Sequence, residues 1–190
     1  MNTIKRILLL VVTIVAIHTT NAQTKVGAVT LPNSLTYGAD NLDLNGAGIR
    51  KKMAFIKLYS GGLYLQSKSK DASAIVNSDE TMAIRLVITS GFVSSSAMSD
   101  AVEDGFEAST GGDKSAITSE IEKFKGFFSD EIVEDDIFDI TYQKGKGVVA
   151  YKNKKELGSI SGMVFKKALF GIWLGDDPVD SKLKKAMLGK

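Results

Sequence analysis

The sequence predicts an α+β fold, in which an antiparallel β-sheet is covered on one face by a layer of helices. Three observations lead to this prediction. Strand-like segments, helical segments, more strands and a last helix follow one another in that order, which is typical of α+β folds. The helical segments carry apolar stripes at spacings of three and four residues, so each has one core-facing side. No internal repeat or linker divides residues 23–190, which we therefore expect to form one domain.

Short strands open this predicted domain. They are expected at 26–31, 35–37 and 42–44, with a turn around Pro32-Asn33. The Asn45-Gly46 pair predicts another turn, because it supplies positive φ angles cheaply. Gly46 and Gly48 leave the backbone bare, so that another chain segment or a ligand can approach closely.

A long apolar run then predicts the central strand. Residues 54–65 are apolar on both faces except at Lys57, which indicates a strand covered on both sides. Arg50 lies at the start of this strand, and Tyr59 is expected on the same strand. Gly61-Gly62 interrupts the run and marks a bulge or a close contact.

The remaining elements follow from their caps and apolar periodicity. We expect a short helix from Asp71, a strand at 81–89, helices with core stripes Met98–Val102–Phe106 and Ile117–Ile121–Phe124–Phe128, strands at 137–142, 148–152 and 157–160, a helix from Gly162 with Val164 on one of its apolar lines, and a last helix capped by Asp180.

The first 22 residues have the features of a secretory signal peptide. Lys5-Arg6 forms a positive start, 7–17 is an apolar core too short for a comfortable membrane span, and Thr20-Asn21-Ala22 is a small-residue cleavage site. The sequence therefore predicts cleavage after Ala22 and an exported protein, periplasmic or extracellular, with no membrane span in its mature chain. The basic excess of the whole chain lies in this segment, so the mature chain is close to neutral.

Missing residue types exclude several functions. The chain has no Cys, and its one His, His18, lies in the predicted signal peptide. A Ser-His-Asp triad, a Cys nucleophile and a typical zinc or haem site are therefore excluded from the mature chain, and we expect no metal and no cofactor. No basic stripe with aromatic residues indicates a nucleic-acid partner. Nothing in the sequence specifies an oligomeric state.

Two blocks of residues resemble the chalcone isomerase superfamily. The first is Gly46-Ala47-Gly48-x-Arg50 with Phe55-Ile56-Lys57 and Gly62-x-Tyr64-Leu65, and the second runs from Gly158-Ser159-Ile160 through Phe165 and Phe170–Asp180 to Leu183–Gly189. The resemblance is stronger to the bacterial chalcone-isomerase-like branch than to the plant enzymes. It implies an open-faced β-sandwich with a ligand cleft between the central strands and the helical layer.

The same resemblance bears on function. Arg50 matches the family's arginine, but Tyr59 stands where the plant enzymes carry a Thr, and Ile172 and Trp173 stand where they carry another. The region around Ser96 to Asp100 also lacks the plant enzymes' Tyr and Asn. The family includes non-catalytic members that bind fatty acids, in which the equivalent Arg pairs with the carboxylate. We therefore expect a binding protein for a small hydrophobic carboxylate.

The expected site has a charged anchor in an apolar cleft. Its residues are Arg50 as the anion anchor, Tyr59 as a hydrogen-bond donor, and Phe55, Leu58, Ile172 and Trp173 as apolar lining. Simpler roles remain open at this point: Arg50 in a structural ion pair, and Tyr59 as an ordinary core aromatic.

Two other functions also remain open. One is a cofactor-free isomerase, an intramolecular lyase acting on a chalcone-like phenolic enone, and the other is an exported accessory protein without a ligand. Turnover would single out the first of these, and a co-purified ligand would exclude the second.

Overall fold

The computed structural model describes residues 23–53 and 55–190 of the chain, so the predicted signal peptide lies outside the described residues. In chain order the elements are β1 (Gln23–Val26), β2 (Val29–Pro32), β3 (Ser34–Tyr37), β4 (Asp40–Lys52), β5 (Ile56–Leu65), α1 (Ala72–Asn77), β6 (Met82–Ile88), α2 (Ser95–Thr110), the 3₁₀ turn η1 (Ser115–Ile117), α3 (Thr118–Gly126), β7 (Ile137–Gln143), β8 (Gly147–Lys152), β9 (Lys155–Ile160), α4 (Met163–Leu174) and α5 (Ser181–Met187).

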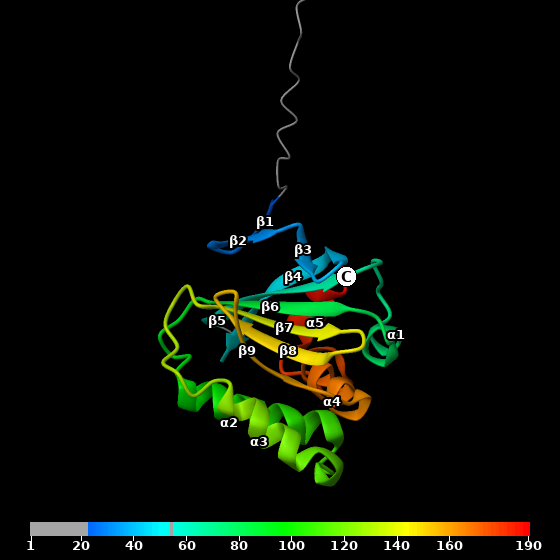
Figure 1. Cartoon of the computed structure of the whole chain (residues 1–190). Helices are drawn as coiled ribbons and strands as arrows, with labels where there is room; N and C mark the ends of the chain where they lie inside the picture. Colours follow the sequence, from blue (N-terminus) through cyan, green and yellow to red (C-terminus); the bar gives the residue numbers. More distant parts are fainter. Residues whose placement is uncertain (1–22, 54) are drawn as a thin grey trace, which may run out of the picture.

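Seven of the strands form one antiparallel sheet in the order β3-β4-β5-β6-β7-β8-β9. Each strand pairs with its neighbour in sequence, and the helices α2, α3 and α4 lie together on one side of the sheet (Figure 1). The rings of Tyr37 on β3 and Tyr151 on β8 are 5.7 Å apart although four strands, β4 to β7, lie between them in the sheet, so the sheet is strongly curled. The predicted α+β architecture is confirmed.

The main core lies between the sheet and the helices. Alternate residues of β6 (Met82, Ile84, Leu86 and Ile88) face it, as their alternation predicts. The stripes Met98–Val102–Phe106 of α2 and Ile117–Ile121–Phe124–Phe128 pack against them. Val164 on α4 is 62 % exposed, contrary to the prediction, because the buried side of this helix is formed by neighbours such as Phe165 and Leu169.

The other face of the sheet is covered by the β1–β2 hairpin, where one continuous strand was expected. Gly27, with φ +65°, turns the chain between the two strands. Val26 and Leu31 of this hairpin pack on Val87 of β6. On the same face Arg85 forms a two-pronged ion pair with Asp139, with N–O distances of 2.6 and 2.8 Å, so this half-buried guanidinium has its anion within the protein.

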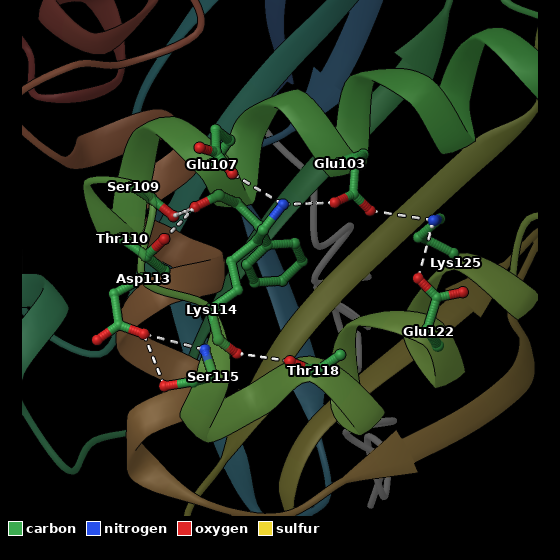
Figure 2. Close-up of polar contacts among 11 residues, drawn as sticks. Glu103, Glu107, Ser109, Thr110, Asp113, Lys114, Ser115, Thr118, Glu122 and Lys125 are labelled. Atoms are coloured by element: carbon green, nitrogen blue, oxygen red, sulfur yellow. Dashed lines mark hydrogen bonds and ion pairs between the residues drawn. The ribbon is translucent and has the colours of Figure 1, made fainter.

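Charged residues join α2 to the segment that follows it (Figure 2). The Lys114 ammonium lies 2.6 Å from Glu103 and 2.8 Å from Glu107, while Lys125 on α3 bridges Glu103 and Glu122 at 3.0 and 2.9 Å. These pairs are partly exposed, so they orient the helices more than they stabilise them. Within the described residues, no helix is long and apolar enough to cross a membrane.

The glycine-rich segment differs most from the prediction. Asn45-Gly46 makes no turn but lies inside β4; the chain turns at Met53, between the end of β4 at Lys52 and the start of β5 at Ile56. Met53 adopts φ +52° there. The bare backbone serves a close contact with α5: a Cβ on Gly46 would lie 2.2 Å from the Ala186 carbonyl oxygen. The close approach expected from the glycines is thus confirmed, with α5 as the approaching segment.

Candidate functional site

The candidate site lies where β4 and β5 meet the helical layer. Arg50 and Tyr59 are opposite each other on these two strands, not on one strand as expected. A shift in the pairing register falls between Arg50 and Lys51, and such bulges redirect side chains next to functional sites. The Arg50 Cζ atom lies 5.7 Å from the centre of the Tyr59 ring.

Tyr59 is held by a residue that lies far from it in the sequence. Its side chain is 3 % exposed, and its hydroxyl accepts a hydrogen bond of 2.9 Å from the indole Nε1 of Trp173 on α4. Burial raises the pKa of Tyr59, against smaller lowering effects of Arg50 and Trp173, so the phenol stays protonated at neutral pH. Because the hydroxyl oxygen is the acceptor towards Trp173, its proton remains available for a ligand.

Arg50 differs from Arg85 in having no anion. Among residues 23–53 and 55–190 it forms no ion pair, and its Nε is buried without a hydrogen-bond partner. Asp180, a nearby carboxylate, is engaged elsewhere: it accepts from the backbone N–H groups of Lys51, Lys182 and Leu183 at 3.2, 2.8 and 3.0 Å. The structural ion pair considered for Arg50 is therefore not formed within the described chain.

Arg50 and Tyr59 both line a cleft of about 810 Å³. The cleft runs between the ends of β4 and β5 on one side and α2 on the other, and the segment Asp177–Val179 closes part of it. Its volume falls within the range of about 300–1,000 Å³ typical of small-molecule sites. A second, apolar cavity of about 30 Å³ lies beside it and is bounded by Arg50, Tyr59, Ile172 and Trp173 among others.

The cleft has an apolar interior and a charged rim. Its buried and half-buried lining is apolar apart from Arg50 and the Tyr59 hydroxyl, and includes Leu58, Val93 and Met98. The other charged residues that line it are exposed: Lys51, Lys52, Asp100, Asp104 and Asp177. A guanidinium at the inner end of an apolar space suits a ligand with an anionic head and an apolar body.

The sequence-predicted site residues are distributed as follows. Arg50, Tyr59 and Leu58 line the large cleft, while Ile172 and Trp173 bound the small cavity behind it. Phe55 lines neither: its side chain is 74 % exposed beside the β4–β5 connection. This connection, which the sequence analysis missed, turns Phe55 away from the site.

The contribution of α2 to the lining was also missed. Small residues recur along one side of this helix and leave room for the cleft; they are Ala97, Ala101, Gly105 and Ala108. Their spacing of three and four residues was the available signal. Among the described residues, no cluster of three or more Asp, Glu, His or Cys side chains is arranged to hold a metal ion.

Comparison with known proteins agrees with this architecture. Residues 23–189 match the model of the chalcone isomerase-like family, and the chain belongs to that family. Among solved structures, a fatty-acid binding protein of Arabidopsis thaliana has the same fold, with a TM-score of 0.67 and 20% sequence identity over 84% of this chain and 91% of that chain. No curated protein sequence matches the chain.

Proposed function

We propose that this protein is an exported, non-catalytic binding protein for a small hydrophobic carboxylate such as a fatty acid, with Arg50 as the anion anchor. The observation that carries the proposal is the guanidinium of Arg50, which faces an apolar cleft with its Nε buried and without a partner among the described residues. A buried N–H donor without an acceptor costs about 1–3 kcal/mol. A ligand carboxylate removes that cost.

The arrangement around Arg50 suits a carboxylate head group. The guanidinium offers a planar fork of donors, and the Tyr59 hydroxyl beside it offers one more. The apolar body of the ligand then lies along Leu58, Val93 and Met98 in the cleft. The fold that the chain shares with a fatty-acid binding protein supports this proposal, and the sequence features of residues 1–22 support export.

The test is calorimetric titration with palmitate and with the neutral alcohol of the same chain length. We expect palmitate to bind more tightly than the alcohol. Arg50→Ala should weaken palmitate binding by about 2–5 kcal/mol, the usual cost of truncating one side of a buried charge pair. Arg50→Lys should restore only part of the loss, because an ammonium cannot form the two-pronged contact.

Lys155→Ala is the matched control, since it removes a cation that is exposed and outside the cleft. It should bind palmitate as the wild type does. Equal binding of acid and alcohol, together with unchanged binding by Arg50→Ala, would show that Arg50 is not an anion anchor.

A further inference from the structure

The three most exposed large apolar side chains among the described residues lie at or beside the mouth of the cleft. Among the described residues, five large hydrophobic side chains are exposed, and the three most exposed are Met53 (70 %), Phe55 (74 %) and Phe92 (73 %). Met53 and Phe55 belong to the β4–β5 connection, and Phe92 follows β6. Met53 and Phe92 both line the cleft, so both segments border it.

Three lysines accompany these side chains. Lys51 and Lys57 are opposite each other in the pairing of β4 with β5, and Lys52 adjoins them. Like charges placed directly opposite on paired strands are destabilising. Within residues 23–53 and 55–190, none of the three forms an ion pair, in contrast to Lys114 and Lys125 on the helical side. This local concentration of positive charge is therefore not explained by contacts within the described chain.

We propose that the cleft-rim patch, defined as Lys51, Lys52, Met53, Phe55, Lys57 and Phe92, docks on the surface of a membrane that contains anionic lipids. Apolar side chains that project next to lysines are the combination that binds such interfaces: the apolar groups enter the headgroup region, and each lysine near the surface adds electrostatic attraction. The biological role of this docking rests on the proposed function as a binding protein for an apolar acid. A cleft that opens onto the bilayer exchanges an apolar acid with the membrane without carrying it through water.

The size of the patch favours a membrane over a protein partner. A standard protein–protein interface uses about 20–30 residues on each side, whereas the six side chains of this patch present a much smaller area. The carboxylates on the rim come from other elements, namely Asp100 and Asp104 on α2 and Asp177 after α4. The basic and apolar side of the mouth is thus the one that meets an anionic surface.

The test is sedimentation of the protein with phosphatidylcholine vesicles, with and without phosphatidylglycerol. We expect binding to the vesicles that contain phosphatidylglycerol, weaker binding to phosphatidylcholine alone, and a loss of binding as salt is added. The diagnostic variant is Phe55→Ser combined with Lys57→Gln, because neither residue lines the cleft. It should bind anionic vesicles at least about fivefold more weakly, since one lysine near such a surface contributes about that factor and the lost phenyl ring adds to it.

The matched control is Val164→Ser combined with Lys155→Gln, which removes an exposed apolar group and an exposed cation from other elements. It should bind vesicles as the wild type does. An equal loss of vesicle binding in both double variants would overturn the proposal, and so would a wild type that binds both vesicle types equally. So would sedimentation velocity showing that Phe55→Ser with Lys57→Gln abolishes a dimer while vesicle binding is unchanged.

Calorimetry with palmitate separates this inference from the proposed function. Phe55→Ser with Lys57→Gln should keep the palmitate affinity of the wild type, and Arg50→Ala should keep vesicle binding while losing palmitate. One outcome is that Arg50→Ala binds palmitate as the wild type does, while the patch variant no longer binds vesicles. In that case the ligand proposal is wrong and the membrane-docking proposal is supported. If the patch variant still binds vesicles and Arg50→Ala no longer binds palmitate, the membrane-docking proposal is wrong and the ligand proposal is supported.

Discussion

The indole of Trp173 and the hydroxyl of Tyr59 are joined by a hydrogen bond of 2.9 Å between residues 114 positions apart in the chain. Both side chains are almost fully buried, at 7 % and 3 % exposure. The bond ties α4 to β5 at the point where Arg50 faces the cleft, so it holds one wall of the candidate site against the sheet.

Tyr59→Phe should lower the free energy of unfolding by about 1–3 kcal/mol, because it leaves the buried Trp173 N–H without an acceptor. Urea denaturation measures the change. Tyr151→Phe is the control: its hydroxyl accepts from Gln143 in a half-buried position, so its loss should cost less. In a double-mutant cycle with Trp173→Phe the two effects should not add; additive effects would show that the bond does not stabilise the fold.

Lys166 should make stability depend on pH in the alkaline range. The residue is fully buried, and its Nζ donates to the carbonyl oxygens of Ile75, Val76 and Ser78 at 3.1, 2.7 and 2.8 Å, at the end of α1. Burial lowers the pKa of Lys166 to about 8. Between this value and the ordinary lysine range the unfolded chain binds the proton and the folded chain does not, so folding is favoured as pH rises.

The measurement is urea denaturation of the wild type and Lys166→Met at several pH values from 7 upward to about 10. Relative to the variant, the wild type should gain stability across this interval. Lys155→Met, which removes an exposed lysine that does not affect the pKa of Lys166, should show no such trend relative to the wild type. A difference between wild type and Lys166→Met that stays constant with pH would show that Lys166 does not titrate in this range.

Gly46→Ala should be strongly destabilising. The added Cβ would lie 2.2 and 2.8 Å from the carbonyl oxygens of Ala186 and Met187, so the backbone at the end of α5 has to move. Overpacking of this kind costs about 1–3 kcal/mol or more. Gly126→Ala is the control, because no atom lies within 4 Å of its added Cβ and alanine favours the helix. Thermal unfolding should separate the two variants in opposite directions; equal melting temperatures would contradict the close packing of α5.

The protein should not cyclise chalcones at an enzyme-like rate. Ile172 has no hydroxyl to offer, and the only N–H of the Trp173 side chain is directed at Tyr59. Loss of one donor to a developing oxyanion costs about a hundredfold or more in rate. An absorbance assay with a hydroxylated chalcone measures the turnover. A rate well above the spontaneous one that disappears in Arg50→Ala would favour the isomerase over the binding protein.

Export predicts a defined N-terminus. The pattern of Lys5-Arg6, the apolar core and Thr20-Asn21-Ala22 predicts that the exported protein begins at Gln23. N-terminal sequencing of the protein recovered from outside the cytoplasm checks this. A product that begins at Met1 and remains in the membrane fraction would contradict it.

The regular parts of this fold could be predicted from the sequence because their signals are local. The alternation in β6 and the stripes of α2 and α3 depend on which face meets the core. The capping residues of α1, α2 and α5 are Asp71, Ser94 and Asp180, and each directly precedes the helix that it caps. Antiparallel pairing of sequential strands then leaves little choice of topology.

The site could be predicted only in part, because its geometry depends on contacts between distant segments. Asn45 reads as a turn residue, but its side chain bonds the backbone of Ser69 and of Met187, which keeps it in an extended strand. The strand therefore continues to Lys52, and Arg50 lies opposite Tyr59 on β5. The burial of Lys166 could not be predicted for the same reason, since its partners are backbone carbonyl groups that no side-chain pattern reveals.

The packing of α5 on β4 has a consequence for the order of events during synthesis. Gly46 and Gly48 are covered by the last turns of the chain, and Asn45 bonds the carbonyl group of Met187, 142 residues later. The Gly46–Gly48 part of β4 therefore stays uncovered until α5 has emerged from the ribosome. A nascent chain of this protein therefore cannot complete this side of its fold before α5 has left the ribosome.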